Sequence, residues 1–271
     1  MPELPEVQTV LNTLEDRIKG RRIESIQILY KPIVVCPEDE FCRRLIGSCF
    51  RDFKRRGKYL LFEMDDITLV SHLRMEGKYF ILDDTYPISR HDHVIFYLDN
   101  GKQLRYNDVR KFGRMELIDK DEDYRRFKDL GPEPFSEEFS VQYCRDYLKE
   151  KKIPIKQVLL DQSFVAGIGN IYADEILSLI HLDPRTPARS LSRKQLEEMI
   201  QQTRNILNRA IEAGGTTIRS YTSSLGVTGR FQLDLSVHGL DVCPICGSGI
   251  KKIRVGGRGT YYCPKCQKKK R

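Results

Sequence analysis

The chain has 271 residues, and its 40% hydrophobic share is enough for one large domain or two smaller domains with buried cores. This composition excludes a disordered tail, and apolar runs of only a few residues exclude a membrane span of roughly 18 residues. No charged start followed by an apolar stretch marks a secretory signal, so we expect a cytoplasmic protein.

The formal net charge of +8 is concentrated at one end of the chain. Residues 241–271 contain nine Lys or Arg and one acid, whereas the rest of the chain carries 37 of each sign. Such an excess indicates a polyanion as partner. A solvated basic tail is the alternative for the last four residues, 268–271.

The first predicted element is an amphipathic helix, because apolar residues recur at helical spacing from Val7 to Ile18 and stop before Gly20. Short runs rich in Ile, Val, Phe, Tyr and Leu follow, separated by turn residues. Asn100-Gly101 lies between two such runs and is typical of a β-hairpin turn. The pattern predicts an antiparallel β-sandwich or barrel after the N-terminal helix.

From Gly131 onward the pattern becomes helical. Ser192 and Gln195 form a capping box at the start of a long helix that ends at Gly214-Gly215. Two further helices are expected at about residues 155–162 and 170–180, on either side of a glycine-containing hinge at residues 165–169. Glycines there let a phosphate approach the backbone at a helix N-terminus, and a plain tight turn is the alternative.

Four of the eight cysteines form two Cys-x-x-Cys pairs separated by sixteen residues, a spacing typical of tetrahedral Zn²⁺. Because the protein fills all four ligand positions, we expect one structural zinc ion that holds a hairpin with Arg258 at its tip. A zinc ribbon for protein contact is the alternative. The zinc ligands are Cys243, Cys246, Cys263 and Cys266. Buried or free thiols are expected at Cys36, Cys42, Cys49 and Cys144.

Three charged stretches in the β region are candidates for nucleic-acid contact. Residues 54–58 form a basic cluster that is either a solvated loop or a clamp on a phosphate backbone. Residues 74–77 and 109–113 each place a long apolar side chain, Met75 or Phe112, beside charged residues in a glycine-ended loop. Such side chains can enter a base stack, and two core residues at strand ends are the alternative.

Five motifs together resemble those of the formamidopyrimidine-DNA glycosylases, the bacterial repair enzymes for oxidised purines. They are PELPEV, SHLRMEGKY, RKFG, VAGIGNIYADE and GRGTYYCPKC, in the family's order and spread over essentially the whole chain. The resemblance implies an α+β protein in three parts. These are a catalytic β-sandwich domain with an N-terminal helix (2–130), a helix-two-turn-helix DNA-binding domain (131–225) and a zinc-finger hairpin (226–271).

The resemblance implies a bifunctional enzyme that excises 8-oxoguanine and formamidopyrimidines from duplex DNA and then cleaves the strand by β,δ-elimination. Met1 would be removed, and the Pro2 amine would attack the sugar and form a Schiff base. A terminal amine has a lower ordinary pKa than lysine and is more readily deprotonated at neutral pH. Glu3 would act beside it as acid and base, and Glu6 would support the site.

The resemblance also implies roles for residues far from the N-terminus. Lys58 would donate a proton during β-elimination and contact phosphate, and Arg258 would act in the second elimination. The residues that would fill the gap left by the flipped nucleotide are Met75, Arg110 and Phe112. Those that would contact DNA are His91, Arg110, Lys151 and Asn170. A mobile loop over the extruded base is expected at Thr216 to Gln232.

One departure from the family is Gln8, where the usual opening PELPEVET has a glutamate. A related enzyme, endonuclease VIII, acts on oxidised pyrimidines and is the nearest alternative, but it usually opens PEGPE, so Leu4 argues against it. A non-enzymatic nucleic-acid-binding module that uses the zinc hairpin is the alternative from another class. The resemblance implies a monomer in the bacterial cytoplasm, associated with the nucleoid, with damaged or abasic duplex DNA as partner.

Overall fold

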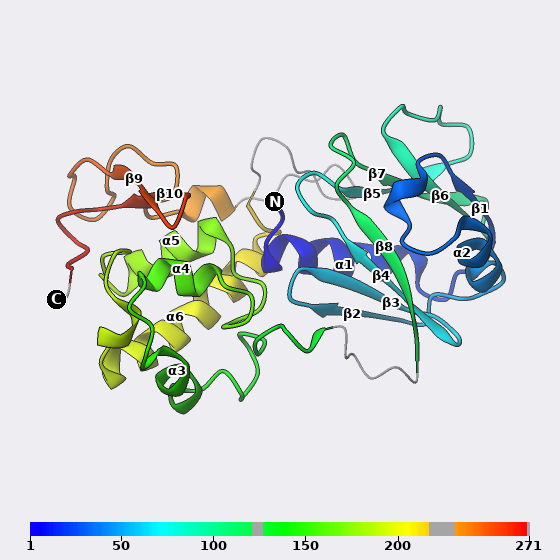
Figure 1. Ribbon diagram of the computed structural model, residues 1–271. Coiled ribbons are helices and arrows are strands. Elements are labelled where there is room, and N and C mark those ends of the chain that lie inside the picture. Colours follow the sequence, from blue (N-terminus) through cyan, green and yellow to red (C-terminus); the bar gives the residue numbers. More distant parts are fainter. Residues whose placement is uncertain (121–126, 217–230, 270–271) are drawn as a thin grey trace. The chain divides into compact units, whose positions relative to one another are not determined.

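The computed structural model describes residues 1–120, 127–216 and 231–269 (Figure 1). The chain divides into two compact units, Met1–Arg126 with Gly214–Arg230 and Phe127–Ala213 with Phe231–Arg271. Strands dominate the first unit, and helices and the cysteine hairpin make up the second, which confirms the expected α+β class. In these described ranges, no helix combines the length and the apolar character needed to cross a membrane.

Two four-stranded antiparallel sheets form the first unit, as the β-sandwich prediction required. The first sheet has the order β1 (Ile23–Ile28), β6 (Asp92–Leu98), β7 (Lys102–Asn107), β5 (Lys78–Asp83). The second has the order β2 (Asp52–Arg56), β3 (Tyr59–Glu63), β4 (Ile67–His72), β8 (Arg114–Asp119). The predicted hairpin turn joins β6 to β7, and Gly101 there has a φ of 73°, which glycine adopts at low cost.

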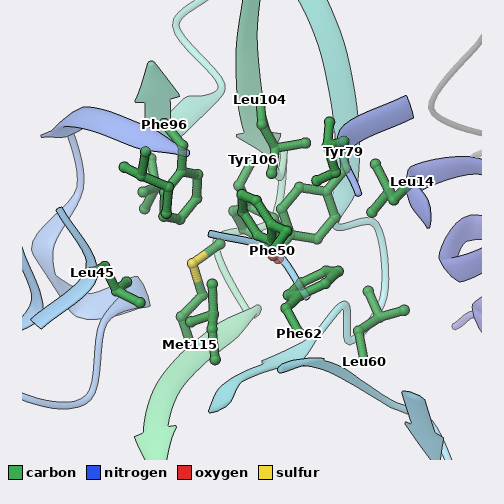
Figure 2. Close-up of a cluster of buried hydrophobic side chains, with 14 of the residues drawn as sticks. Leu14, Leu45, Phe50, Leu60, Phe62, Tyr79, Phe96, Leu104, Tyr106 and Met115 are labelled. Carbon is green, nitrogen blue, oxygen red and sulfur yellow. The ribbon is translucent and has the colours of Figure 1, made fainter. Parts of the chain in front are cut away.

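One hydrophobic cluster joins both sheets to α1 (Leu4–Ile18) and α2 (Glu38–Leu45), and η1 (Lys31–Ile33) also contributes to it (Figure 2). The helical spacing seen in the sequence places Val10 and Leu14 of α1 in this cluster, and both are fully buried. Burying a side chain of this kind contributes roughly 1.5–3 kcal/mol, so the cluster is the main source of stability of the unit. It also fixes the position of the helix that follows the chain's first residues.

The basic cluster at residues 54–58 is a strand and its turn rather than a solvated loop. Residues 54–56 belong to β2, and Gly57-Lys58 form the two-residue turn into β3. β2 is an edge strand, and charged side chains are common on such strands because they discourage pairing with other chains. Because most of its residues are charged, this strand does not show the apolar alternation that is typical of strands in a sequence.

The second unit is built on α-helical and 3₁₀ segments and one hairpin. Its helical segments include α3 (Val141–Leu148), α4 (Ile155–Leu160), α5 (Asn170–Leu179), η3 (Ala188–Ser190), α6 (Arg193–Glu212) and η4 (Phe231–Asp234). The capping box of α6 is present, because the Ser192 backbone N–H donates to Gln195 Oε1 and the Gln195 N–H donates to the Ser192 hydroxyl. The strands β9 (Lys251–Val255) and β10 (Arg258–Tyr262) pair as the hairpin between the two cysteine pairs.

Candidate active site and nucleic-acid interface

The residues that directly precede α1, Pro2 and Glu3, are buried, whereas Met1 is exposed. Glu3 is 3% exposed, and α1 begins directly after Glu3. Burial lowers the pKa of the Met1 amine, and the charges of Lys58 and Arg110 act in the same direction. The carboxylates of Glu3 and Glu6 oppose this lowering. The charges of three predicted site residues, Glu3, Glu6 and Lys58, therefore act on the N-terminal amine.

Glu6 ties the N-terminus of α1 to a segment from much later in the chain. Its Oε2 accepts the Glu3 backbone N–H at 2.9 Å, and its Oε1 accepts both the N–H and the hydroxyl of Thr216 at 2.9 and 3.0 Å. The preceding Gly215 has a φ of 79°, and a Cβ there would lie 3.0 Å from Glu6 Oε1. Glu6 is thus a buried carboxylate that three donors hold in place.

Lys58 occupies the β2–β3 turn and is 5% exposed. Arg55 braces this turn, because its Nη1 donates to the carbonyl of Gly57 at 2.9 Å. The Nε of Arg55 in turn donates to Gln8 Oε1 at 3.0 Å. The departure at Gln8 therefore lies in contact with an arginine that orients the Lys58 turn.

His72, at the end of β4, belongs to the same charged group, and the sequence analysis missed it. Burial lowers its pKa to about 3, and the positive charges of Arg74 and Lys58 contribute to the lowering. Its Nδ1 accepts the backbone N–H of Arg74 at 2.9 Å, and its ring packs against that of Tyr59. The imidazole is neutral at pH 7 and holds the loop that carries Met75. A histidine directly before the glycine-ended loop was the available signal.

The two loops with Met75 and Phe112 have the same local design. Each apolar side chain follows a non-glycine residue in the left-handed region, Arg74 with a φ of 54° and Lys111 with a φ of 58°. Met75 is 37% exposed and Phe112 is 48% exposed, so neither is a core residue at a strand end. The Arg110 guanidinium lies 4.8 Å from the centre of the Phe112 ring. In both loops a left-handed residue thus directly precedes the exposed apolar side chain.

The remaining predicted DNA contacts divide between the units. In the first unit, His91 is half-buried, and its carbonyl accepts the N–H of Asp108 at 3.0 Å. The Nδ1 of His91 is buried with no hydrogen-bond partner among the described residues. In the second unit, the Lys151 ammonium lies 5.0 Å from the centre of the Tyr147 ring.

The four expected zinc ligands come together in the second unit. The sulfur atoms of Cys243, Cys246, Cys263 and Cys266 all lie within 4.8 Å of one another. The separations are 3.9 Å between Cys243 and Cys266 and 3.5 Å between Cys246 and Cys263. A tetrahedral Zn²⁺ with bonds of about 2.3 Å to sulfur requires separations near 3.8 Å. The cluster fits one structural zinc ion, as expected.

The zinc hairpin is fastened to α4 and α5 by a buried polar network. The Lys156 ammonium donates to Asp174 at 2.6 Å, to Thr260 Oγ1 at 2.8 Å and to the Gly259 carbonyl at 3.1 Å. Asn170 Nδ2 also donates to the Gly259 carbonyl, at 2.9 Å. Its Oδ1 is buried without a partner among the described residues. Asn170 is thus bonded to the residue that directly follows the exposed Arg258, so the network anchors the turn that carries this arginine.

The acidic pair in the motif YADE supports the same hairpin. Asp174 also binds His238 Nδ1, and Glu175 accepts the backbone N–H groups of Ser236, Val237 and His238 at 2.7–2.9 Å. Burial raises the pKa of Glu175, and the three N–H donors oppose that rise.

One backbone N–H of the expected glycine-containing phosphate turn already has a partner within the protein, because the N–H of Gly167 donates to Gln162 Oε1. The expected mobile loop lies outside the described residues, apart from its two ends.

Family models match nearly the whole chain. Residues 1–115 match the formamidopyrimidine-DNA glycosylase N-terminal domain, and residues 130–222 match the H2TH domain of the same enzymes. Residues 241–269 match a zinc finger found in FPG and IleRS. The three matches follow the order of the parts that the sequence analysis expected.

Curated relatives and solved structures agree with these models over their full length. Formamidopyrimidine-DNA glycosylases of Bacillus licheniformis and Bacillus subtilis are 46% and 47% identical, with at least 99% of this chain and 100% of each relative covered. The Lactococcus lactis enzyme bound to DNA with an abasic site has a TM-score of 0.93 and 43% identity, covering 98% of this chain and 100% of that chain. A variant of that enzyme bound to DNA containing Fapy-dG has a TM-score of 0.94 and 43% identity, with 99% of this chain covered and 100% of that one. The chain belongs to the formamidopyrimidine-DNA glycosylase family.

Proposed function

We propose that this protein is a DNA glycosylase that excises oxidised purines from duplex DNA and then cleaves the resulting abasic site as a lyase. Its family membership and the DNA complexes of its relatives support the substrate class. The observation that carries the proposal is the position of the N-terminal amine: burial lowers its pKa, Glu3 and Glu6 oppose this lowering, and Lys58 adds to it. An amine in such surroundings is suited to nucleophilic attack.

The proposed reaction starts when Met1 has been removed. The Pro2 nitrogen forms a bond to C1′ of the damaged nucleotide while the bond from C1′ to the base breaks, and the base leaves with a proton. The sugar ring then opens as Glu3 gives a proton to the ring oxygen, which leaves a cationic iminium. Proline is a secondary amine, so the intermediate keeps its positive charge and draws electrons from the sugar.

Strand cleavage follows from this electron demand. Loss of a proton from C2′ expels the 3′ phosphate, and the second elimination expels the 5′ phosphate. We assign Lys58 to proton donation and phosphate contact in the first elimination and Arg258 to the second. The burial of Lys58 strengthens its electrostatic interaction with an incoming phosphate, and the anchored turn of the zinc hairpin supports the assignment of Arg258.

DNA recognition is assigned to residues whose side chains are exposed or carry polar atoms without partners. Met75, Arg110 and Phe112 would fill the space left by the flipped nucleotide, and Arg110 would hydrogen-bond the opposite cytosine. His91, Lys151 and Asn170 would contact the strand backbone. The exposure of Met75 and Phe112 and the unpartnered atoms of His91 and Asn170 support these roles.

The proposal also covers organisation and location. The zinc ion would be structural, since four cysteines leave no open coordination position for a substrate. The division into residues 2–130, 131–225 and 226–271 is proposed on the order of the matched domains. We also propose that the protein acts as a monomer in the bacterial cytoplasm, in association with the nucleoid, because the curated relatives are bacterial DNA glycosylases.

Borohydride trapping tests the proposal directly. Borohydride reduces the iminium, so Met-free protein becomes covalently attached to lesion-containing duplex DNA, and mass spectrometry places the cross-link on Pro2. Protein that retains Met1 serves as the control and is not trapped. Parallel duplexes with formamidopyrimidine-guanine, 8-oxoguanine or an oxidised pyrimidine separate this activity from that of an endonuclease VIII. DNA binding without any trapping would leave only the binding-module alternative.

A further inference from the structure

The loops that carry Met75 and Phe112 meet at one buried hydroxyl. Tyr106, on β7, is fully buried, and its ring is part of the core shown in Figure 2. A Cβ added to Gly77, at the end of the Met75 loop, would lie 2.3 Å from the Tyr106 hydroxyl oxygen. A Cβ added to Gly113, at the end of the Phe112 loop, would lie 1.6 Å from the same atom. Because the hydroxyl is so close, neither position has room for a Cβ, and both must be glycine.

The hydroxyl is also bonded to the residue that folds the second loop. Tyr106 donates to Asp108 Oδ2 at 3.4 Å. The same Oδ2 accepts the N–H groups of Phe112 and Gly113 at 2.9 and 2.8 Å, and Oδ1 accepts the N–H of Arg110 at 3.0 Å. Asp108 is 0% exposed, so these donors replace the water that a carboxylate requires. One buried carboxylate therefore shapes the whole turn that presents Arg110 and Phe112.

The Met75 loop is closed by its own hydrogen bonds, and its Gly77 lies against the Tyr106 hydroxyl. The N–H of Gly77 donates to the carbonyl of Leu73 at 3.0 Å, and the His72 ring accepts the N–H of Arg74. Tyr79 and Tyr106 are direct partners in the β5–β7 pairing, and their rings are 5.2 Å apart. A shift of Tyr106 would therefore move both loops, because neither glycine leaves space for the hydroxyl to move without displacing backbone.

We infer that Tyr106 and Asp108 are positioning residues that couple the Met75 loop to the Arg110–Phe112 loop, so that the two loops enter the base stack as one rigid element. Burial and the Asp108 charge raise the pKa of Tyr106 well above its ordinary value, so the hydroxyl stays protonated as a donor. The inference rests on the proposed function, since it assigns a purpose to the loops that this function uses. It concerns base extrusion and not the chemistry at Pro2.

Two conservative variants remove the coupling with little change of shape. Tyr106→Phe removes the hydroxyl that lies between the glycines. Asp108→Asn keeps the volume but replaces one acceptor oxygen by an NH₂ group, which cannot accept the loop N–H groups on its side. Tyr79→Phe is the matched control, because Tyr79 is another buried tyrosine of the same core, and its hydroxyl donates to Ser71 Oγ at 2.7 Å rather than to Asp108.

The decisive readout is the ratio of two single-turnover rates. Excision of formamidopyrimidine-guanine opposite cytosine requires base extrusion, whereas cleavage of a preformed abasic site requires the same catalytic groups without a base to extrude. We expect Asp108→Asn to lower excision about tenfold or more and Tyr106→Phe to lower it several-fold, because small misplacements of positioning groups have large effects on rate. Abasic-site cleavage should stay within about twofold in both variants, and Tyr79→Phe should leave the ratio unchanged.

A measurement without DNA tests the coupling itself. Hydrogen exchange should become faster for peptides covering residues 108–113 in Asp108→Asn, and also for residues 73–77, where no hydrogen bond to Asp108 exists. An effect confined to residues 108–113, or an equal loss of both rates in the activity assay, would overturn the inference. Wild-type protein that neither excises the lesion nor cleaves the abasic site would instead overturn the proposed function, while the exchange result would still decide the coupling.

Discussion

Glu6 and Thr216 are 210 residues apart in the chain and are joined by two buried hydrogen bonds. The same carboxylate accepts the N–H of Glu3, so the start of the chain and the segment at residues 214–216 depend on one side chain. Glu6 therefore stabilises the position of the first residues through these hydrogen bonds.

Replacing Glu6 by Gln tests this arrangement. The amide offers one acceptor oxygen, so at least one of the three donors loses its partner at a cost of about 1–3 kcal/mol. We expect the melting temperature to fall by several degrees and abasic-site cleavage to fall about tenfold or more. Thr216→Val, which removes only the hydroxyl donor, should give a smaller loss in both. Equal activity of Glu6→Gln and wild type would show that Glu6 does not position the site.

The depressed pKa of His72 gives a defined dependence of stability on pH. The folded protein holds the imidazole neutral down to about pH 3, whereas the unfolded chain binds a proton near the ordinary value of 6.5. Between these values the unfolded state binds more protons, so stability is present above pH 6.5 and is lost as the pH falls toward 3. The loss is about 1.4 kcal/mol for each pH unit.

His72→Asn keeps an acceptor for the Arg74 N–H but does not titrate. Urea unfolding at pH 7 and pH 5 should show that wild type loses about 2 kcal/mol more than the variant over this interval. The carboxylates common to both proteins cancel in the comparison. An identical pH dependence of the two proteins would mean that folding does not lower the pKa of His72.

Zinc removal should act on DNA binding through the hairpin. Cys263→Ser removes one of four thiolates, and we expect the zinc content to fall from one ion per chain to nearly none. DNA affinity, measured by fluorescence anisotropy, should fall about tenfold or more, because residues 241–271, which include the hairpin, carry the excess positive charge of the chain. Cys36→Ser is the control, since Cys36 lies outside the cluster. Retention of zinc by Cys263→Ser would contradict the assigned ligand set.

The Gln8→Glu substitution restores the residue that the family usually has. A glutamate would accept the Arg55 Nε–H as an ion pair, which strengthens a bond that already exists. We expect a melting temperature equal to or slightly above that of wild type and a change in excision rate of less than tenfold. A gain of tenfold or more would show that Gln8 limits the reaction. Gln8→Ala removes the acceptor of the Arg55 Nε–H and should reveal whether this hydrogen bond is needed for excision.

The sequence predicted the elements whose signals are local. The apolar spacing of α1, the Asn100-Gly101 turn and the Ser192 capping box each depend on residues within a few positions of one another, and all three are present. The four zinc ligands also lie together, because two tight cysteine turns leave few other arrangements. Edge strand β2 was hidden by its charges, since an exposed strand has no need of apolar alternation.

Residues that organise the site through buried hydrogen bonds gave only a weak signal. His72 and Asp108 organise loops by accepting backbone N–H groups, and any histidine or aspartate beside a turn has the same local sequence appearance. Glu6 was expected to support the site, but its partner Thr216 lies too far along the chain for spacing to reveal. The roles of Pro2 and Lys58 came from the resemblance, and their burial together with Glu3 is what the structure adds.

The start of α1 directly after Glu3 has a further consequence for the terminal amine. The aligned peptide dipoles of a helix place about half a positive charge at its N-terminus. After removal of Met1, the Pro2 nitrogen lies just beyond that end, where an ammonium ion is disfavoured and an uncharged amine is not. Because the helix begins this early in the chain, its dipole favours the uncharged form of the terminal amine, which is the form that can act as a nucleophile.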